Sequence, residues 1–129
     1  MATAFVTGAS SGIGRAIALE LAAAGHEVTA VARGAAALAA LAAENPAITP
    51  LALDLTDDAA LAAALADRPI DILVNNAGMI PPLGPFWDTD PADTARALQV
   101  NLAAVLSVTR HVVPGMRARG RGHVIFTGS

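Results

Sequence analysis

The residues that most clearly indicate a binding role lie near the N-terminus, in the sequence Thr7-Gly8-Ala9-Ser10-Ser11-Gly12-Ile13-Gly14. Gly8 permits a sharp turn, Gly12 lets a diphosphate approach the backbone, and Gly14 lets the following helix pack closely. The first turn of that helix offers free N–H groups and the positive end of its dipole to phosphate oxygens. The pattern predicts a dinucleotide site, and a glycine-rich turn without a ligand is the alternative. The candidate residues are Gly8, Ser10, Ser11, Gly12, Ile13 and Gly14.

Arg33 is the second candidate, because it follows the apolar run Val28–Ala32. A site selective for NAD carries Asp or Glu about 20 residues beyond the glycine turn, where the carboxylate binds the ribose 2′-OH. This chain has Ala32 and then Arg33 at that place. This chain therefore has no carboxylate at that place to repel a 2′-phosphate, and the Arg33 guanidinium can donate two hydrogen bonds to such a phosphate. We therefore expect NADP(H) to be preferred, with NAD(H) possible, unless Arg33 is simply a surface residue at a strand end.

Polar or small residues also close the third and fourth apolar runs. Asp54 and Leu55 follow Ile48–Leu53, and Asn75-Asn76-Ala77-Gly78 follows Ile70–Val74. In sheets of this kind ligands bind outside the carboxyl ends of the strands. Asp54 is either an adenine contact, with the Leu55 N–H on a ring nitrogen, or a turn aspartate. Asn75 suits a structural tie between strands equally well, whereas Asn76, Ala77 and Gly78 are candidates for lining a ribose.

These candidates must be positioned by short apolar runs that alternate with alanine-rich helical segments. We expect strands at 4–7, 28–32, 48–53, 70–74 and 123–127. We expect helices at 11–24, at 35–44, from a cap at Thr56 or Asp57 to about Ala66, and from Asp90-Pro91 to about Arg117. Strand and helix alternation at this spacing gives βαβ units, and these form a parallel sheet covered on both faces.

Periodicity assigns some side chains to the core. In the first helix we expect an apolar face of Ile13, Ile17 and Leu21. The leucines expected to face inward from the next two helices are Leu38, Leu41, Leu61 and Leu65. The inward stripe expected on the long helix is Leu98, Asn101, Val105, Val108 and Val112. We expect Phe86 and Trp87 to cover that helix, and Arg117, Arg119 and Arg121 to form a solvated cap at its end.

Composition limits the class of protein. Of 129 residues, 54% are hydrophobic and 15% charged, which excludes a disordered chain. The longest clean apolar helical stretch, Ala97–Thr109, is too short to span a bilayer, and no signal peptide is recognised, so we expect a cytoplasmic protein. A net charge of −3 disfavours nucleic-acid binding. With no cysteine, and with three histidines that show neither metal-ligand spacing nor an obvious carboxylate partner, we expect no metal site.

These motifs, in this order, resemble those of the short-chain dehydrogenase/reductase family. Thr7–Gly14 matches the family's T-G-x-x-x-G-x-G, and Asn75–Gly78 matches its N-N-A-G. Asp54 stands where the family places an adenine-binding Asp. Asn101 and Ser129 match its catalytic Asn, which holds a water in a proton relay, and its catalytic Ser, which fixes the substrate oxygen. For Asn101, a hydrogen-bonded structural amide is the alternative.

The resemblance implies a Rossmann-type, doubly wound α/β domain over residues 1–129 with strand order 3-2-1-4-5. It also implies hydride transfer between a nicotinamide cofactor and a small-molecule alcohol or carbonyl substrate, in a homo-oligomer. The chain departs from the family in one respect: it has no tyrosine, and all eight basic residues are arginine. The family's Tyr-x-x-x-Lys, which follows the catalytic Ser, is therefore absent.

We accordingly expect a C-terminally incomplete enzyme that is inactive by itself, with Ser129 and an edge strand at its cut side. The alternative from another functional class is a non-catalytic NAD(P)-binding or sensing module.

Overall fold

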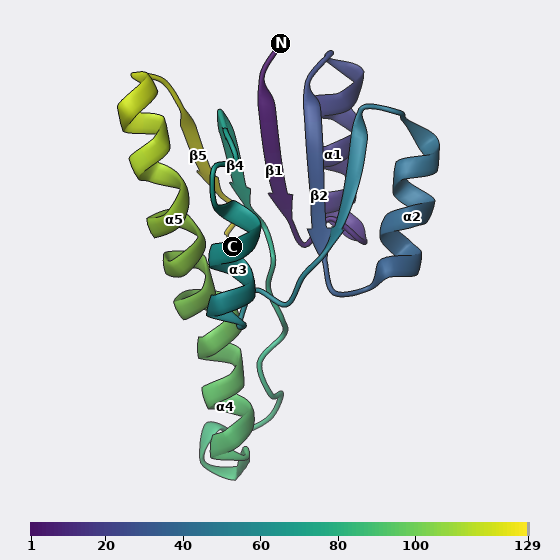
Figure 1. The fold of residues 1–129 in the computed structure, drawn as a ribbon. Coiled ribbons are helices and arrows are strands. Elements are labelled where there is room, and N and C mark those ends of the chain that lie inside the picture. The colour runs from purple at the N-terminus through teal and green to yellow at the C-terminus, as the bar shows by residue number, and fades with distance from the viewer. Residues whose placement is uncertain (129) are drawn as a thin grey trace.

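A single parallel sheet organises residues 1–128, the part of the chain that the computed structural model describes (Figure 1). Its strands are β1 (Thr3–Thr7), β2 (Glu27–Ala32), β3 (Ile48–Ala52), β4 (Ile72–Asn75) and β5 (His123–Phe126). Their order in the sheet is β3-β2-β1-β4-β5, and every neighbouring pair is parallel. The predicted strand order 3-2-1-4-5 is confirmed.

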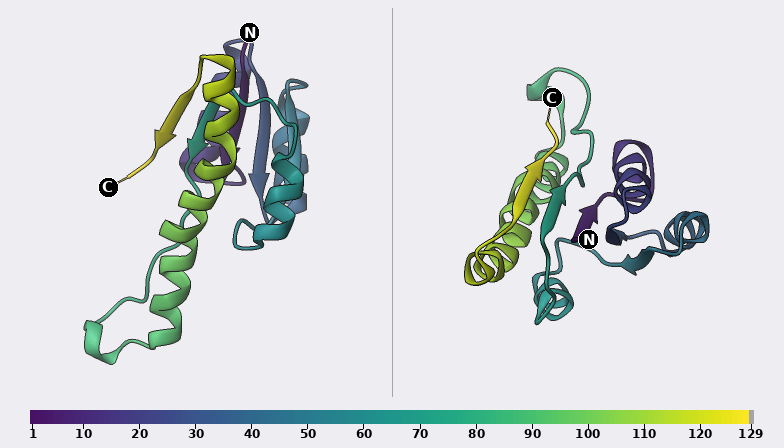
Figure 2. Two further views of the ribbon diagram at one scale, coloured as in Figure 1. Left: turned by 60° about the vertical axis from the view of Figure 1, so that its left-hand side comes forward. Right: turned by 90° about the horizontal axis from the view of Figure 1, so that it is seen from above.

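Helices lie on both faces of this sheet, as Figure 2 shows. One face carries α1 (Gly12–Ala23) and α2 (Ala35–Glu44), and the other carries α3 (Asp58–Leu65) and α5 (Ala104–Arg119). A further helix, α4 (Pro91–Leu98), extends with the loop before it beyond the carboxyl edge of the sheet (Figure 1). Asp90 caps α4 by accepting a hydrogen bond from the Ala92 N–H, and Asp57 caps α3 in the same way from Ala60.

Each strand supplies side chains to two separate cores, because successive residues of a strand point to opposite faces. On β1, Ala4 and Val6 pack toward α1 and α2, whereas Phe5 packs toward α3 and α5. The four leucines predicted to face inward are all buried: Leu38, Leu41, Leu61 and Leu65.

The buried face of α1 differs from the prediction. Gly14, Ala18 and Ala22 are buried, whereas Ile13 is 66% exposed. Small residues let the backbone of α1 approach the sheet closely, so a bulky side chain is excluded from the centre of the contact. The periodicity located the helix correctly but assigned the wrong side chain to its inner face.

The long helix is also interrupted, by a five-residue π-helical segment, Gln99–Ala103, between α4 and α5. A π turn holds more residues than an α turn and so rotates the faces on either side of it. The buried residues are Ala97, Ala104, Val108, Val112 and Met116. The inward positions predicted for Leu98 and Asn101 are wrong: Leu98 is 57% exposed, and Asn101 is exposed as well.

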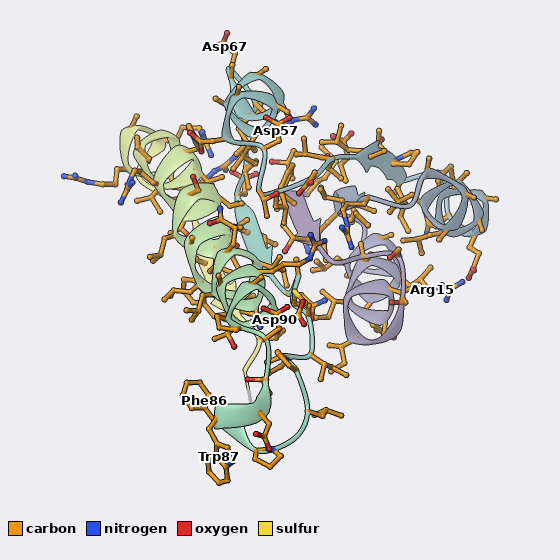
Figure 3. All side chains as sticks on the ribbon, turned by 90° about the horizontal axis from the view of Figure 1, so that it is seen from below. Arg15, Asp57, Asp67, Phe86, Trp87 and Asp90 are labelled. Carbon is orange, nitrogen blue, oxygen red and sulfur yellow. The ribbon has the colours of Figure 1, made fainter. Side chains whose placement is uncertain are left out.

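A further prediction about side chains is wrong. Phe86 and Trp87, expected to cover the long helix, are 76% and 82% exposed and project from the end of the loop (Figure 3). The three arginines at the end of the long helix are exposed as predicted, and Arg119 and Arg121 also lie 3.7 and 3.3 Å from the Asp71 carboxylate. Among residues 1–128, no helix combines the length and the hydropathy of a membrane span.

Candidate functional site

The parallel strands bring the predicted site residues to one edge of the sheet. The glycine turn follows β1, Arg33 follows β2, Asp54 follows β3 and Asn76 follows β4. Because β1 pairs with β2 and β4, and β2 pairs with β3, these four strand ends are neighbours.

The glycine turn packs tightly against the segment that follows β4. Gly8 has φ +64°, and a Cβ there would lie 2.8 Å from Ala77 Cα. A Cβ on Gly14 would overlap the Gly8 carbonyl oxygen and Asn76 Nδ2. Only glycine fits either position, because the neighbouring atoms belong largely to backbone that cannot move aside.

Gly12 is in a different situation. Its φ is +56°, but a Cβ there would meet no atom within 4 Å, so this side of the turn is open. Ser11 is the N-cap residue of α1, and its side chain makes no capping hydrogen bond. The first N–H groups of a helix have no partner within the helix and need a cap, a water or a ligand. The open turn and the uncapped first turn of α1 therefore fit a phosphate group.

The Thr7 hydroxyl joins β1 to the end of β4. Thr7 Oγ1 donates to the Val74 carbonyl oxygen at 3.3 Å and accepts from the N–H groups of Asn76 and Ala77, both at 3.0 Å. The side chain is buried, with 1% exposure. Thr7 was not among the predicted site residues, although a hydroxyl at the end of an apolar strand was the signal that could have identified it.

The two asparagines at the end of β4, the last strand residue and the one that follows it, are both held by hydrogen bonds. Asn75 is buried, and its Nδ2 donates to Thr109 Oγ1 on α5 at 3.1 Å, as a structural tie would. Asn76 Nδ2 donates to the Gly8 carbonyl oxygen at 3.3 Å, and Asn76 Oδ1 accepts from Thr127 Oγ1 at 3.1 Å. The Asn76 amide thus holds together the glycine turn, the end of β4 and the end of β5. Thr7, Gly8 and Asn76 are joined by hydrogen bonds and Gly14 packs against them, and we call these four residues the turn cluster.

Asp54 makes an aspartate turn of the kind the sequence left open. Its Oδ1 accepts from the Thr56 N–H at 2.9 Å and from Thr56 Oγ1 at 2.7 Å. The hydrogen bond from the Thr56 hydroxyl, followed by the one from its N–H, lowers the pKa of Asp54, and the Arg33 guanidinium adds to the effect. Asp54 is therefore ionised at neutral pH, and both Asp54 and Arg33 are exposed at the carboxyl edge.

Asn101 lies in the π-helical segment and clamps the loop that follows Gly78. Its Oδ1 accepts from the Met79 N–H at 2.7 Å, and its Nδ2 donates to the Met79 carbonyl oxygen at 2.9 Å. Both ends of the amide are thereby oriented. Ser129 lies outside the described residues. Within residues 1–128, no group of three or more metal-ligating side chains is arranged to hold a metal ion.

Comparisons with known proteins indicate one family. The profile of the family described as short chain dehydrogenase matches residues 2–129. D-erythrulose reductase of Gallus gallus is 48% identical over 118 residues, which cover 91% of this chain and 48% of that protein. The chain spans about half the length of the curated relatives it matches.

Solved structures show the same likeness. The closed form of serine dehydrogenase complexed with NADP+ has a TM-score of 0.94 and 34% identity, with 98% of this chain and 54% of that chain covered. A metagenomic short-chain oxidoreductase in complex with NADP has a TM-score of 0.90 and 38% identity, with 97% and 60% covered. From the profile match over nearly its whole length, this chain belongs to the short-chain dehydrogenase family.

Proposed function

We propose that residues 1–129 form the dinucleotide-binding domain of an NADP(H)-dependent oxidoreductase that interconverts an alcohol and a carbonyl. The observation that carries the proposal is the open glycine turn at the uncapped start of α1, at the same sheet edge as an exposed Arg33. The two similar structures whose descriptions name NADP+ or NADP support the choice of cofactor. The similar D-erythrulose reductase supports a carbonyl substrate.

Each edge segment has a proposed role in holding the cofactor. The glycine turn and the first N–H groups of α1 bind the diphosphate, through Gly8, Ser10, Ser11, Gly12, Ile13 and Gly14. Arg33 binds the 2′-phosphate, and Asp54 and Leu55 contact the adenine. Ala77 and Gly78 line the ribose, and Asn76 positions them because its amide is already bonded to Gly8 and Thr127.

The bound nicotinamide supplies the hydride donor or acceptor, and the protein orients the reactants and manages the proton. We propose that Ser129 fixes the substrate oxygen and that Asn101 holds a water of the proton relay. The pair of hydrogen bonds to Met79 supports the Asn101 assignment, because it fixes the orientation of the amide. The chain has no tyrosine and no lysine, so we propose that it has no turnover by itself.

A homo-oligomer is the proposed assembly. Leu98, Leu102 and Leu106 recur every four residues along α4, the π-helical segment and α5, and they are 57%, 54% and 53% exposed. Contiguous apolar surface of this kind marks interaction sites in soluble proteins.

The cofactor assignment is tested by calorimetric titration with NADPH and NADH. We expect NADPH to bind at least about ten-fold more tightly, because charge-assisted hydrogen bonds to a phosphate are strong. Arg33→Asp should reverse that preference, while Arg117→Asp, on exposed α5 surface, should not. Gly12→Val should abolish binding of both cofactors with little change in circular dichroism. Equal affinity for both cofactors, unaltered by Arg33→Asp, would show that Arg33 does not read the 2′-phosphate.

Turnover is tested with the 129-residue chain, a panel of carbonyl compounds and NADPH. No rate above background is expected, because general acid catalysis at the carbonyl needs a positioned proton donor. Turnover by a chain of verified 12.9 kDa mass would refute the role assigned to the missing Tyr and Lys. A longer parent chain that binds NADPH but contains no Tyr-x-x-x-Lys after Ser129 would favour the non-catalytic sensing module.

A further inference from the structure

A cavity lies between α3 and α5, far from the predicted cofactor site. It has a volume of about 540 Å³ and is lined by the C-terminal part of α3, the loop that leads into β4, and the second half of α5. That loop reaches the start of β4, so the cavity lies at the amino edge of the sheet, opposite the glycine turn. We call it the α3–α5 groove, after its lining residues Leu65, Arg68, His111, Val112 and Arg119.

The groove combines an apolar floor with a nitrogen-rich rim. Leu65 and Val112 are buried beneath it, with 7% and 6% exposure. Arg68, His111 and Arg119 line it from the loop and from α5. Asp67 is the one carboxylate in the lining, and Figure 3 shows its side chain directed away from the body of the protein. Small-molecule sites typically have a volume of this order.

Both guanidinium groups are held in place by the protein before any ligand binds. Arg119 Nη2 donates to the Ile70 carbonyl oxygen at 2.5 Å. Its Nη1 lies over Gly115, where a Cβ would approach within 3.1 Å. Arg68 Nε donates to the Ala64 carbonyl oxygen at 2.9 Å, and its Nη1 to Thr29 Oγ1 at 3.3 Å. Since a guanidinium has five N–H donors, each arginine retains donors for a further acceptor.

Two carboxylates near the rim have other contacts within the protein. Asp71 Oδ2 accepts twice from Thr3, and its buried Oδ1 lies 3.3 Å from Arg121 and 3.7 Å from Arg119 without a hydrogen bond. Asp58 lies 3.7 Å from His111, which the sequence had left without a carboxylate partner, and accepts from Ser107 Oγ at 2.6 Å. The charged residues that line the groove are therefore two arginines and one aspartate, in addition to His111.

We propose that the α3–α5 groove binds a small organic anion, a carboxylate carried on an apolar chain or ring. The guanidinium groups of Arg68 and Arg119 bind the carboxylate, and the apolar part lies on Leu65 and Val112. The proposal does not depend on the cofactor site, because the two places are at opposite edges of the sheet.

The test titrates the 129-residue chain with sodium octanoate and follows backbone amide signals by NMR. Octanoate should shift the signals of Gly115 and Arg68 and leave that of Gly12 unchanged, while octanol should bind more weakly. Arg119→Gln should weaken octanoate binding about five-fold, which is a solvent-screened fraction of a charged hydrogen bond. Arg68→Gln should do the same, and Arg117→Gln, on α5 outside the groove, should have no effect.

Three results would overturn the proposal. They are no saturable binding of octanoate, shifts confined to the carboxyl edge, and equal affinity in both groove variants and the parent. Gly115→Ala provides an independent check if an arginine variant does not fold, because the added methyl crowds the Arg119 guanidinium and should also weaken octanoate binding.

Discussion

The turn cluster and the loop that precedes α4 both lie at the carboxyl edge, yet they are built in opposite ways. The turn cluster has no large apolar side chain, and its position is fixed by backbone contacts and by hydrogen bonds from Thr7 and Asn76. We call residues 79–90 the arm. Its largest apolar side chains are exposed by 76–87%: Ile80, Leu83, Phe86 and Trp87. Asn101 holds its start, and the Asp90 cap marks its end.

The difference shows where fold stability and candidate function separate. In the turn cluster, the lack of a Cβ on glycine stabilises the fold, because the close contact between Gly14 and Gly8 leaves no room for a side chain. In the arm, apolar surface remains in water and contributes little to the folding of this chain, because hydrophobic stabilisation scales with the area buried. Apolar content alone does not place a segment in the core.

The largest effect is expected from Gly14→Ala. Its methyl would overlap the Gly8 carbonyl oxygen and Asn76 Nδ2, so we expect the free energy of unfolding to fall by about 3 kcal/mol or more. Gly34→Ala is the matched control, because a Cβ there would meet no atom within 4 Å. We expect a loss below about 0.5 kcal/mol there. Urea unfolding measures both, and equal losses would show that the turn cluster is not rigid.

Intermediate losses of stability are expected when the contacts at the two ends of β4 are removed. An ionised carboxylate makes the contacts at the start of the strand, and a neutral hydroxyl makes those at its end. Thr3 donates two hydrogen bonds to Asp71, from its N–H and its hydroxyl, and with Arg121 and Arg119 nearby they lower the pKa of Asp71. A carboxyl group with a lowered pKa in the folded state stabilises the fold above its unfolded pKa of about 3.9. That stabilisation is lost as the pH falls through the folded pKa.

Asp71→Asn should therefore cost about 1–2 kcal/mol at pH 7, and the difference from the parent should shrink below about pH 5. Thr7→Val removes the acceptor of two partly buried N–H groups and should cost about 1–2 kcal/mol at every pH, because the turn cluster has no ionisable group. Unfolding free energies measured from pH 7 to pH 3 test both. A pH-independent cost for Asp71→Asn would mean that its charge does not contribute to the tie.

The strand order followed from the family resemblance. The sequence itself predicted the helix caps and the leucines of α2 and α3, because capping chemistry and helical period act locally. It placed Leu98 and Asn101 on the wrong face because the π-helical segment shifts the period, and no local pattern marked that segment. It did not find the Thr7 hydrogen bonds, which join residues almost 70 positions apart in the chain. It assigned Phe86 and Trp87 to a core because bulk is visible in a sequence, whereas the direction in which a loop projects is set by distant contacts such as Asn101 with Met79.

The smallest effect is expected in the arm. Phe86→Ala and Trp87→Ala should each change the free energy of unfolding by less than about 0.5 kcal/mol, because both side chains are exposed. Phe5→Leu, at a fully buried ring, should cost about 1 kcal/mol and serves as the control. Unfolding is best followed by circular dichroism, because Trp87 is the only tryptophan and the Trp87→Ala variant has no tryptophan fluorescence. A loss above 1 kcal/mol that grows with protein concentration would place the arm in an oligomer contact. A loss that is independent of concentration would mean that the arm packs within its own chain.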